Sequence, residues 1–134
     1  MAYLKPSAFT RRVFNPIMGR LTPGAIEDLS VIGRRSNRPH HTPVQPVVVG
    51  GSEYLVAVYG DTQWSRNLRA SGIGELTHHG HHRSVRAQEV SVAERGPILA
   101  VYRQEARSVE APFRTLPDPA DHPVFRLSPM KSTG

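Results

Sequence analysis

The chain of 134 residues contains no cysteine. Disulfide bonds and thiolate metal sites are therefore excluded, and a reducing compartment is compatible with the sequence. It also has no apolar run long enough to cross a bilayer, and no signal-peptide core is visible. From these absences we expect a cytoplasmic protein.

Lysine is scarce as well, because arginine supplies 15 of the 17 basic residues. The net charge of +6 attracts polyanions such as nucleic acid, anionic lipid or a charged cofactor. Arginine suits a defined grip on oxyanions, although high-GC codon usage gives the same bias. A small nucleic-acid-binding barrel needs aromatic residues among its basic ones. With four Phe, four Tyr and one Trp, none of them in the basic loop described below, we expect no nucleic-acid partner.

Residues 5–21 have the pattern of an amphipathic helix. Apolar residues recur at spacings of three and four, and Lys5, Arg11, Arg12 and Arg20 occupy the remainder. The simpler interpretation is a helix packed over a sheet. The alternative is a peripheral contact with an anionic membrane surface, which would make the protein membrane-associated.

Beyond this helix the chain is rich in turns, with 12 Pro and 11 Gly. The length favours a single domain over 1–134. Residues 26–127 predict a mainly β, α+β fold of about six mostly antiparallel strands that close into a small barrel. These strands are expected at 26–32, 44–49, 53–59, 73–78, 81–90 and 123–127, and 53–59 should be central and buried on both faces.

A short helix is expected over 62–70, after the third strand, with Asp61 as N-cap and Gly72 just past its end. Hairpin turns are expected at 50–52 and at His79-Gly80. A further short helix is expected at 98–104, whereas 110–121 should be irregular. Residues 128–134 should form a frayed tail.

Residues 33–44 form a basic segment between two apolar runs. Gly33 opens it, and Pro39 and Pro43 argue against a helix, so we expect a loop. Its arginines, histidines and hydroxyl groups suit a phosphorylated or polycarboxylate ligand. A solvated basic turn is the simpler alternative.

A second segment follows the third predicted strand. A loop that leaves a strand through Gly60 lets backbone amides approach a flat ring, and the next helix offers its positive N-terminus to the same space. Trp64 can form an aromatic wall, while Arg66 and Asn67 add polar contacts. Trp64 could equally be a core residue at helix spacing.

Together the two segments resemble a known family. Gly33-Arg34-Arg35-Ser36 with Thr42-Pro43-Val44, followed by Trp64-Ser65-Arg66-Asn67-Leu68-Arg69-Ala70, are similar to motifs of the deazaflavin-dependent nitroreductase and quinone reductase family. Its members are split β-barrel, flavin-reductase-like oxidoreductases that bind coenzyme F420. The resemblance covers residues 26–90 and fades after Val90.

The resemblance implies a set of cofactor-binding residues. Arg34, Arg35, Ser36 and Arg38 lie where the family grips the phosphate and acidic tail. The remaining candidate cofactor-binding positions are His40, Thr42, Pro43, Val58, Tyr59, Gly60, Asp61, Trp64, Arg66 and Asn67. Two positions depart from the family pattern: Asn37 replaces a Gly but tolerates a left-handed turn, and His40 replaces an Arg.

The implied chemistry is hydride transfer from reduced F420 to a quinone, nitro compound or activated double bond. Tyr59 and Trp64 are candidates for lining the acceptor pocket, and no catalytic residue can be named. FMN is an alternative cofactor, because a phosphate grip does not separate the two. The alternative function is a non-catalytic binder of deazaflavin, FMN or lipid on the same fold. Either a monomer or a homodimer is compatible with the sequence.

Four histidines, His78, His79, His81 and His82, flank Gly80. A cross-strand pair could bind zinc or nickel, but no acidic residue or cysteine lies close enough in sequence to complete a site. Exposed histidines at a hairpin tip explain the cluster, and we expect no metal.

Overall fold

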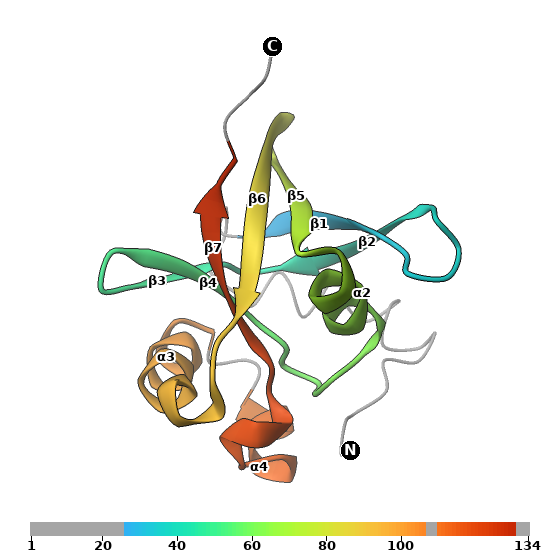
Figure 1. Ribbon diagram of the computed structural model, residues 1–134. Coiled ribbons are helices and arrows are strands. Elements are labelled where there is room, and N and C mark those ends of the chain that lie inside the picture. The colour runs from blue at the N-terminus through green and yellow to red at the C-terminus, as the bar shows by residue number, and fades with distance from the viewer. Residues whose placement is uncertain (1–25, 107–109, 131–134) are drawn as a thin grey trace.

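The computed structural model describes residues 26–106 and 110–130. Their strands form one seven-stranded antiparallel sheet in the order β2-β1-β5-β6-β7-β4-β3 (Figure 1). The strands are β1 (Glu27–Ile32), β2 (Pro39–Val44), β3 (Val47–Val49), β4 (Ser52–Val56), β5 (Ile73–His78), β6 (His81–Glu89) and β7 (Val124–Pro129). The helices are α2 (Gln63–Ser71), α3 (Val92–Glu105), α4 (Glu110–Thr115) and the 3-10 turn η2 (Pro119–Asp121).

The sheet curls into a half-barrel. Strands β2 and β3 lie at its two edges, yet only residues 45 and 46 separate them in the chain. The mainly β, antiparallel α+β prediction is confirmed, but the strand count is seven instead of six. Consequently α2 follows the fourth strand and not the third. The helix expected over 5–21 lies outside the described residues.

Part of the basic segment is a strand, which corrects the prediction of a loop over 33–44. β2 takes up Pro39–Val44, and only residues 33–38 form the loop. Proline is tolerated because β2 is an edge strand that pairs with β1 alone, so the missing N–H groups break no second ladder. Whether prolines are tolerated in this strand depends on its place in the sheet, which the sequence does not reveal.

The prediction of a central strand over 53–59 is also wrong. β4 ends at Val56, lies one place from the sheet edge, and its first three residues are only half-buried. After it, α2 begins at Gln63 and has Thr62 as its N-cap, one residue later than expected. Gly72 ends α2 in the left-handed conformation with φ 72°, as predicted.

Both predicted hairpin turns are present. Gly50 and Gly51 connect β3 to β4, and His79 and Gly80 connect β5 to β6. All four have positive φ, the backbone that two-residue hairpins require.

The C-terminal third is more regular than expected. α3 has 14 residues and contains Pro97. It starts at Val92, six residues before the start of the helix predicted over 98–104. Gly96 and Pro97 disfavour a helix locally, so the sequence does not predict the first half of α3. Packing of Ile98, Leu99 and Tyr102 in the core stabilises the helix nonetheless. Residues 110–121, expected to be irregular, contain α4 and η2. Residues 128 and 129 belong to β7 and are not part of a frayed tail.

Two hydrophobic clusters lie on opposite faces of the sheet. One joins Leu68 of α2 to side chains of β1, β4, β5, β6 and β7. Because β1 and β4 are not neighbours in the sheet, this cluster fills the inside of the curl. The other packs α3 against β3, β4 and β7 from outside. α2 is therefore held against the inner face, where it meets the loop after β1 (Figure 1).

Candidate cofactor site

The loop 33–38 is a tight turn between β1 and β2. The Gly33 N–H donates to the Arg38 carbonyl over 2.8 Å, and the Asn37 N–H donates to the Gly33 carbonyl over 3.0 Å. Asn37 has φ 60°, so its replacement of the family glycine keeps the left-handed turn. A Cβ at Gly33 would lie 2.5 Å from both His40 Nε2 and Ser36 Oγ, so a larger residue would displace these two side chains.

Ser36 gathers polar groups at the centre of this loop. Its Oγ lies 2.8 Å from His40 Nε2 and accepts from the Arg38 N–H over 3.2 Å. Thr42, two residues beyond His40, shares a face of β2 with it, whereas Pro43 points to the other face. The structure thus brings Ser36, Arg38 and His40 together, and Pro43 stands apart from them.

Arg34 fixes the loop to α2. Its Nη1 donates to Asn67 Oδ1 over 2.7 Å and to Gln63 Oε1 over 3.0 Å. Asn67 Oδ1 also accepts from the Arg34 backbone N–H over 3.1 Å. Both partners are neutral amides, so they orient the guanidinium without cancelling its charge.

Arg35 and Arg38 are exposed. In the described part of the chain, no carboxylate is paired with either side chain or with Arg34. Three guanidinium groups within five residues therefore form a positive surface that can bind an anion with several oxygens.

The segment that follows β4 is held at its start by buried polar contacts. The Ala57 N–H donates to the Pro123 carbonyl over 2.9 Å, and the Ala57 carbonyl lies 3.0 Å from Nδ1 of the buried His122. Gly60 has φ 91°, a backbone that favours glycine. Burial raises the pKa of the Tyr59 phenol, which therefore stays protonated and can donate a hydrogen bond. Val58 packs against the outer cluster.

Asp61 holds the other end of this segment. Its carboxylate is buried, and Oδ1 accepts from Ser65 Oγ over 2.7 Å and from Arg69 Nη2 over 3.2 Å. Oδ2 lies 3.5 Å from Arg66 Nε. Burial raises the pKa of Asp61, but the Ser65 hydrogen bond and the charges of Arg69 and Arg66 outweigh it, so the pKa lies below its ordinary value.

From Asp61 an ion-pair network runs across the inner face to α3. Arg69 Nε donates to Glu89 Oε1 over 2.6 Å, and Glu89 Oε2 accepts from Arg95 Nη2 over 3.2 Å. Arg95 is buried and also donates to the carbonyls of Val90, Pro119 and His122. This network connects α2, β6, α3 and the segment before β7.

Trp64 is half-buried and packs against Phe125, with ring centroids 6.1 Å apart at 51°. Its ring belongs to the inner cluster, which supports the simpler interpretation of Trp64 as a core residue. The segment 58–61 and the loop 33–38 both contact α2, through Asp61 and Arg34 respectively. α2 is therefore the element that sets their relative position.

Several residues in this arrangement escaped sequence reasoning. Gln63 lies one helical turn before Asn67, and Ser65 lies four residues after Asp61, so their spacing could have revealed them. No local pattern indicates the other contacts. Glu89 meets Arg69 across 20 residues of sequence, Arg95 meets the His122 carbonyl across 27, and His122 meets Ala57 across 65.

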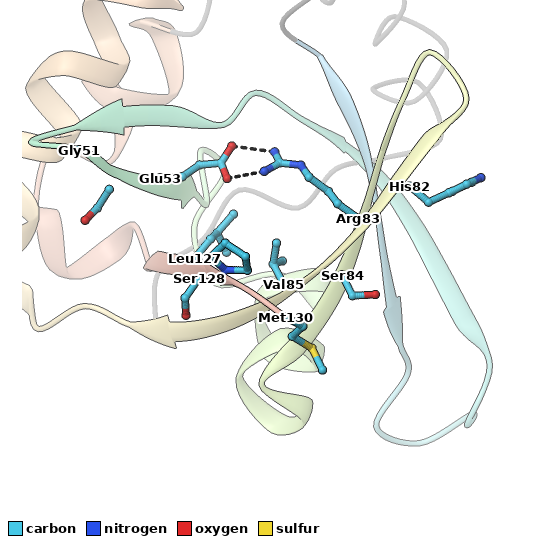
Figure 2. A pocket seen from close by; sticks show the side chains of 11 residues that line it. Gly51, Glu53, His82, Arg83, Ser84, Val85, Leu127, Ser128 and Met130 are labelled. Carbon is cyan, nitrogen blue, oxygen red and sulfur yellow. Dashed lines mark hydrogen bonds and ion pairs between the residues drawn. The ribbon is translucent and has the colours of Figure 1, made fainter. Parts of the chain in front are cut away.

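A cavity of about 830 Å³ lies at the other end of the half-barrel, lined by the starts of β4 and β6 and the end of β7 (Figure 2). None of the predicted cofactor residues lines it. β1 runs from Glu27, near this cavity, to the loop 33–38, so its six residues separate the two places by roughly 17 Å.

The histidine cluster stays at the tip of the β5–β6 hairpin. His82 Nδ1 lies 2.8 Å from Thr77 Oγ1, and the ring centroids of His78 and His79 lie 4.1 Å apart with the ring planes tilted by 42°. Among residues 26–106 and 110–130, no group of three or more potential ligands could hold a metal ion. Within the same residues, no helix combines the length and apolarity needed to span a membrane.

Many solved structures have a similar fold, among them the following three. An F420-H2 dependent reductase, FDR-A, is 19% identical with a TM-score of 0.59, over 78% of this chain and 94% of its own. A structure described as a domain-swapped dimer is 17% identical with a TM-score of 0.58, over 92% and 100% of the two chains. HutZ, the heme storage protein from Vibrio cholerae, is 14% identical with a TM-score of 0.58, over 88% and 90%.

No curated protein matches the sequence. The sequence profile of F420H(2)-dependent quinone reductases, in contrast, matches residues 6–116, which include the arginine loop, the segment after β4 and α2. The fold is the split barrel of flavin-reductase-like proteins. The chain belongs to the F420H(2)-dependent quinone reductase family.

Proposed function

We propose that the protein is an F420H2-dependent oxidoreductase that reduces a small organic acceptor, with a quinone as the first choice. The observation that carries the proposal is the loop 33–38, where three arginines face no carboxylate in the described part of the chain. Family membership supplies the identity of the anionic cofactor.

The residues present fit such a cofactor. Arg35, Arg38 and the Ser36 hydroxyl would bind its phosphate and acidic tail, while Arg34, oriented by Asn67, would add a third cation. His40, at 2.8 Å from Ser36, would adjust the position of that hydroxyl. The remaining matched residue on this face of β2, Thr42, would extend the polar surface.

When bound, the reduced deazaflavin supplies the hydride. The protein supplies position: the backbone at Gly60 would lie against the ring, and the clamps at Ala57 and Asp61 would hold that backbone in place. Tyr59 would donate a hydrogen bond to the acceptor, because its phenol remains protonated. Trp64 would contribute only the edge of its half-buried ring.

Two assays on the purified protein test the proposal. Fluorescence titration with oxidised F420, run beside FMN, should give micromolar or tighter binding of F420 and much weaker binding of FMN. Oxidation of F420H2 should then depend on added menadione. Tight binding without turnover would favour a non-catalytic deazaflavin binder, and absence of binding would overturn the cofactor assignment.

A further inference from the structure

Ser36 and His40 form a hydrogen-bonded pair at the turn between β1 and β2. Ser36 Oγ lies 2.8 Å from His40 Nε2, and a Cβ at Gly33 would come within 2.5 Å of each atom, so the pair lies directly against this glycine. The Arg38 N–H donates to the same Oγ over 3.2 Å. Both Ser36 and His40 are exposed, so an anion from solvent can reach the pair.

The position of one proton decides what this pair can offer an anion. A serine hydroxyl has one proton to donate and two lone pairs that accept, and the Arg38 N–H occupies one lone pair. If Ser36 donates its proton to a bare His40 Nε2, only a lone pair is left for the ligand, and it repels an oxyanion. If Nε2 carries a proton and donates it to Oγ, the hydroxyl is free to donate to the oxyanion.

The charged groups on the same loop are all cations. In the described part of the chain, no carboxylate pairs with Arg34, Arg35, Arg38 or His40. An oxyanion bound by these arginines would lie beside His40. Its negative charge would stabilise the imidazolium, the form in which both ring nitrogens carry a proton.

The elements packed against β2 do not supply a competing carboxylate. Val31, the residue opposite His40 on β1, is apolar and buried. α2 contacts β2, and its two charged residues, Arg66 and Arg69, both lie beside Asp61. The charge that a bound anion brings would therefore be the main negative charge near His40.

His41, the next residue, provides the contrast. It points to the other face of β2, where its Nδ1 lies 2.7 Å from Asp28 Oδ2. His41 thus has a carboxylate partner within the protein, whereas His40 has a hydroxyl. Of these two neighbouring histidines, only His40 is placed to respond to an anion at the loop.

We propose that oxyanion binding at the loop 33–38 is proton-linked: the protein takes up a proton at His40 when a phosphate group binds. The imidazolium would donate from Nε2 to Ser36 Oγ, and it would add a positive charge to those of the three arginines. Histidine changes its charge between about pH 5 and 8, so the affinity should fall as the pH rises through this range. That the phosphate belongs to a deazaflavin rests on the proposed function, but the proton linkage does not.

The test begins with sulfate, a phosphate analogue that does not change its charge over this pH range, so that any pH dependence belongs to the protein. The ¹⁵N-labelled full chain is titrated with sodium sulfate at constant ionic strength, and NMR chemical shifts are followed. Shifts should appear at residues 33–40. The affinity should be about fivefold lower at about pH 8 than at about pH 5.5.

Three variants assign the linkage to one ring. His40→Gln keeps an N–H donor for Ser36 but cannot change its charge, so its affinity should not vary with pH. His40→Arg should bind sulfate at about pH 8 as tightly as the parent does at about pH 5.5, because its charge is permanent. His41→Gln is the matched control and should keep the pH dependence of the parent.

A pH dependence that persists in His40→Gln, one that disappears in His41→Gln, or sulfate shifts away from residues 33–40 would each overturn the proposal. The same titrations with F420 separate this inference from the proposed function. The ratio of the affinities of the parent and His40→Gln cancels any ionisation of the cofactor, and it should fall as the pH rises. A constant ratio would overturn the linkage, whereas pH-linked sulfate binding without F420 binding would support it and overturn the cofactor assignment alone.

Discussion

At one end of β1, Arg83 faces the carboxylates of Glu27 and Glu53; at the other end, Arg34 faces the side-chain amides of Asn67 and Gln63. Arg69 and Arg95 resemble Arg83, because Asp61 and Glu89 neutralise them. Arg35 and Arg38 resemble Arg34, since no carboxylate of the described residues pairs with them. The protein therefore contains two groups of arginines that differ in the charge of their partners.

The difference teaches how one residue type serves two purposes. A guanidinium paired with a carboxylate connects elements of the fold and has little charge left for a ligand. A guanidinium held by amides keeps its full charge in a fixed orientation. Changes to the first group should therefore alter stability, and changes to the second should alter binding of the anionic cofactor.

Replacing Arg35 and Arg38 together by alanine should have the largest effect. Each lost charged hydrogen bond to the cofactor costs about 1.5–3 kcal/mol, so F420 should bind at least about 10²-fold more weakly. Fluorescence titration measures this, and urea unfolding should show unchanged stability. Arg86→Ala, which removes an exposed arginine from β6, is the matched control. Equal loss in both variants would show that total charge matters instead of the loop.

Asp61→Asn should be next, with an effect on stability. It removes the carboxylate that Ser65, Arg66 and Arg69 contact, at a cost of about 2–3 kcal/mol, because the two arginines can partly rehydrate. Urea unfolding measures the change. Asp28→Asn, at an exposed His41 pair, should cost about 0–1 kcal/mol. Similar losses in the two variants would contradict the structural role of the network.

At acid pH the parent and Asp61→Asn should have the same free energy of unfolding. The pKa of Asp61 lies below its ordinary value of about 3.9, so its carboxylate stabilises the fold fully above that pH. That stabilisation is lost as the pH falls through the lower pKa of the folded state. Unfolding curves from pH 7 to pH 2 should therefore converge below about pH 4. A constant difference would mean that the carboxylate charge is not what matters.

Asn67→Asp should have the smallest effect of these changes on cofactor binding. It would give Arg34 a carboxylate partner and so place it in the group that contains Arg83. A carboxylate at the Oδ1 position, 2.7 Å from Nη1, would neutralise the guanidinium. F420 should bind about fivefold more weakly, roughly 1 kcal/mol, with stability unchanged or slightly higher. Gln63→Glu, at the longer and exposed contact, should change the affinity less. Tighter binding in Asn67→Asp would show that Arg34 does not meet the cofactor.

Most of the sheet could be read from local signals. Glycines at 50, 51, 72 and 80 mark turns that need positive φ, and alternation between them predicts the strands. The errors occur where tertiary context overrides local signals. Pro39 and Pro43 fit a strand only because β2 lies at the edge, and Gly96-Pro97 fits a helix only because α3 is anchored by its buried residues.

The candidate site, like the sheet, could be predicted in part from the sequence. The arginines and the motif after β4 stand out in the sequence, and Asn37 could be recognised as a left-handed residue. The side chains that pair with each arginine could not be predicted from the sequence. Asn67 is 33 residues from Arg34, and Glu53 is 30 residues from Arg83. A contact of residues 5–21 with a membrane and the choice between monomer and homodimer stay predictions.

The central claim is that the cofactor binds at the end of the half-barrel where Arg34, Arg35 and Arg38 pair with no carboxylate of the described residues. Chemical-shift mapping of the ¹⁵N-labelled chain with F420 tests it most directly. The account predicts shifts at residues 33–40 and at Gly60, with little change at residues 82–85. Shifts centred on residues 82–85 and 127–130, with the arginine loop unchanged, would contradict it.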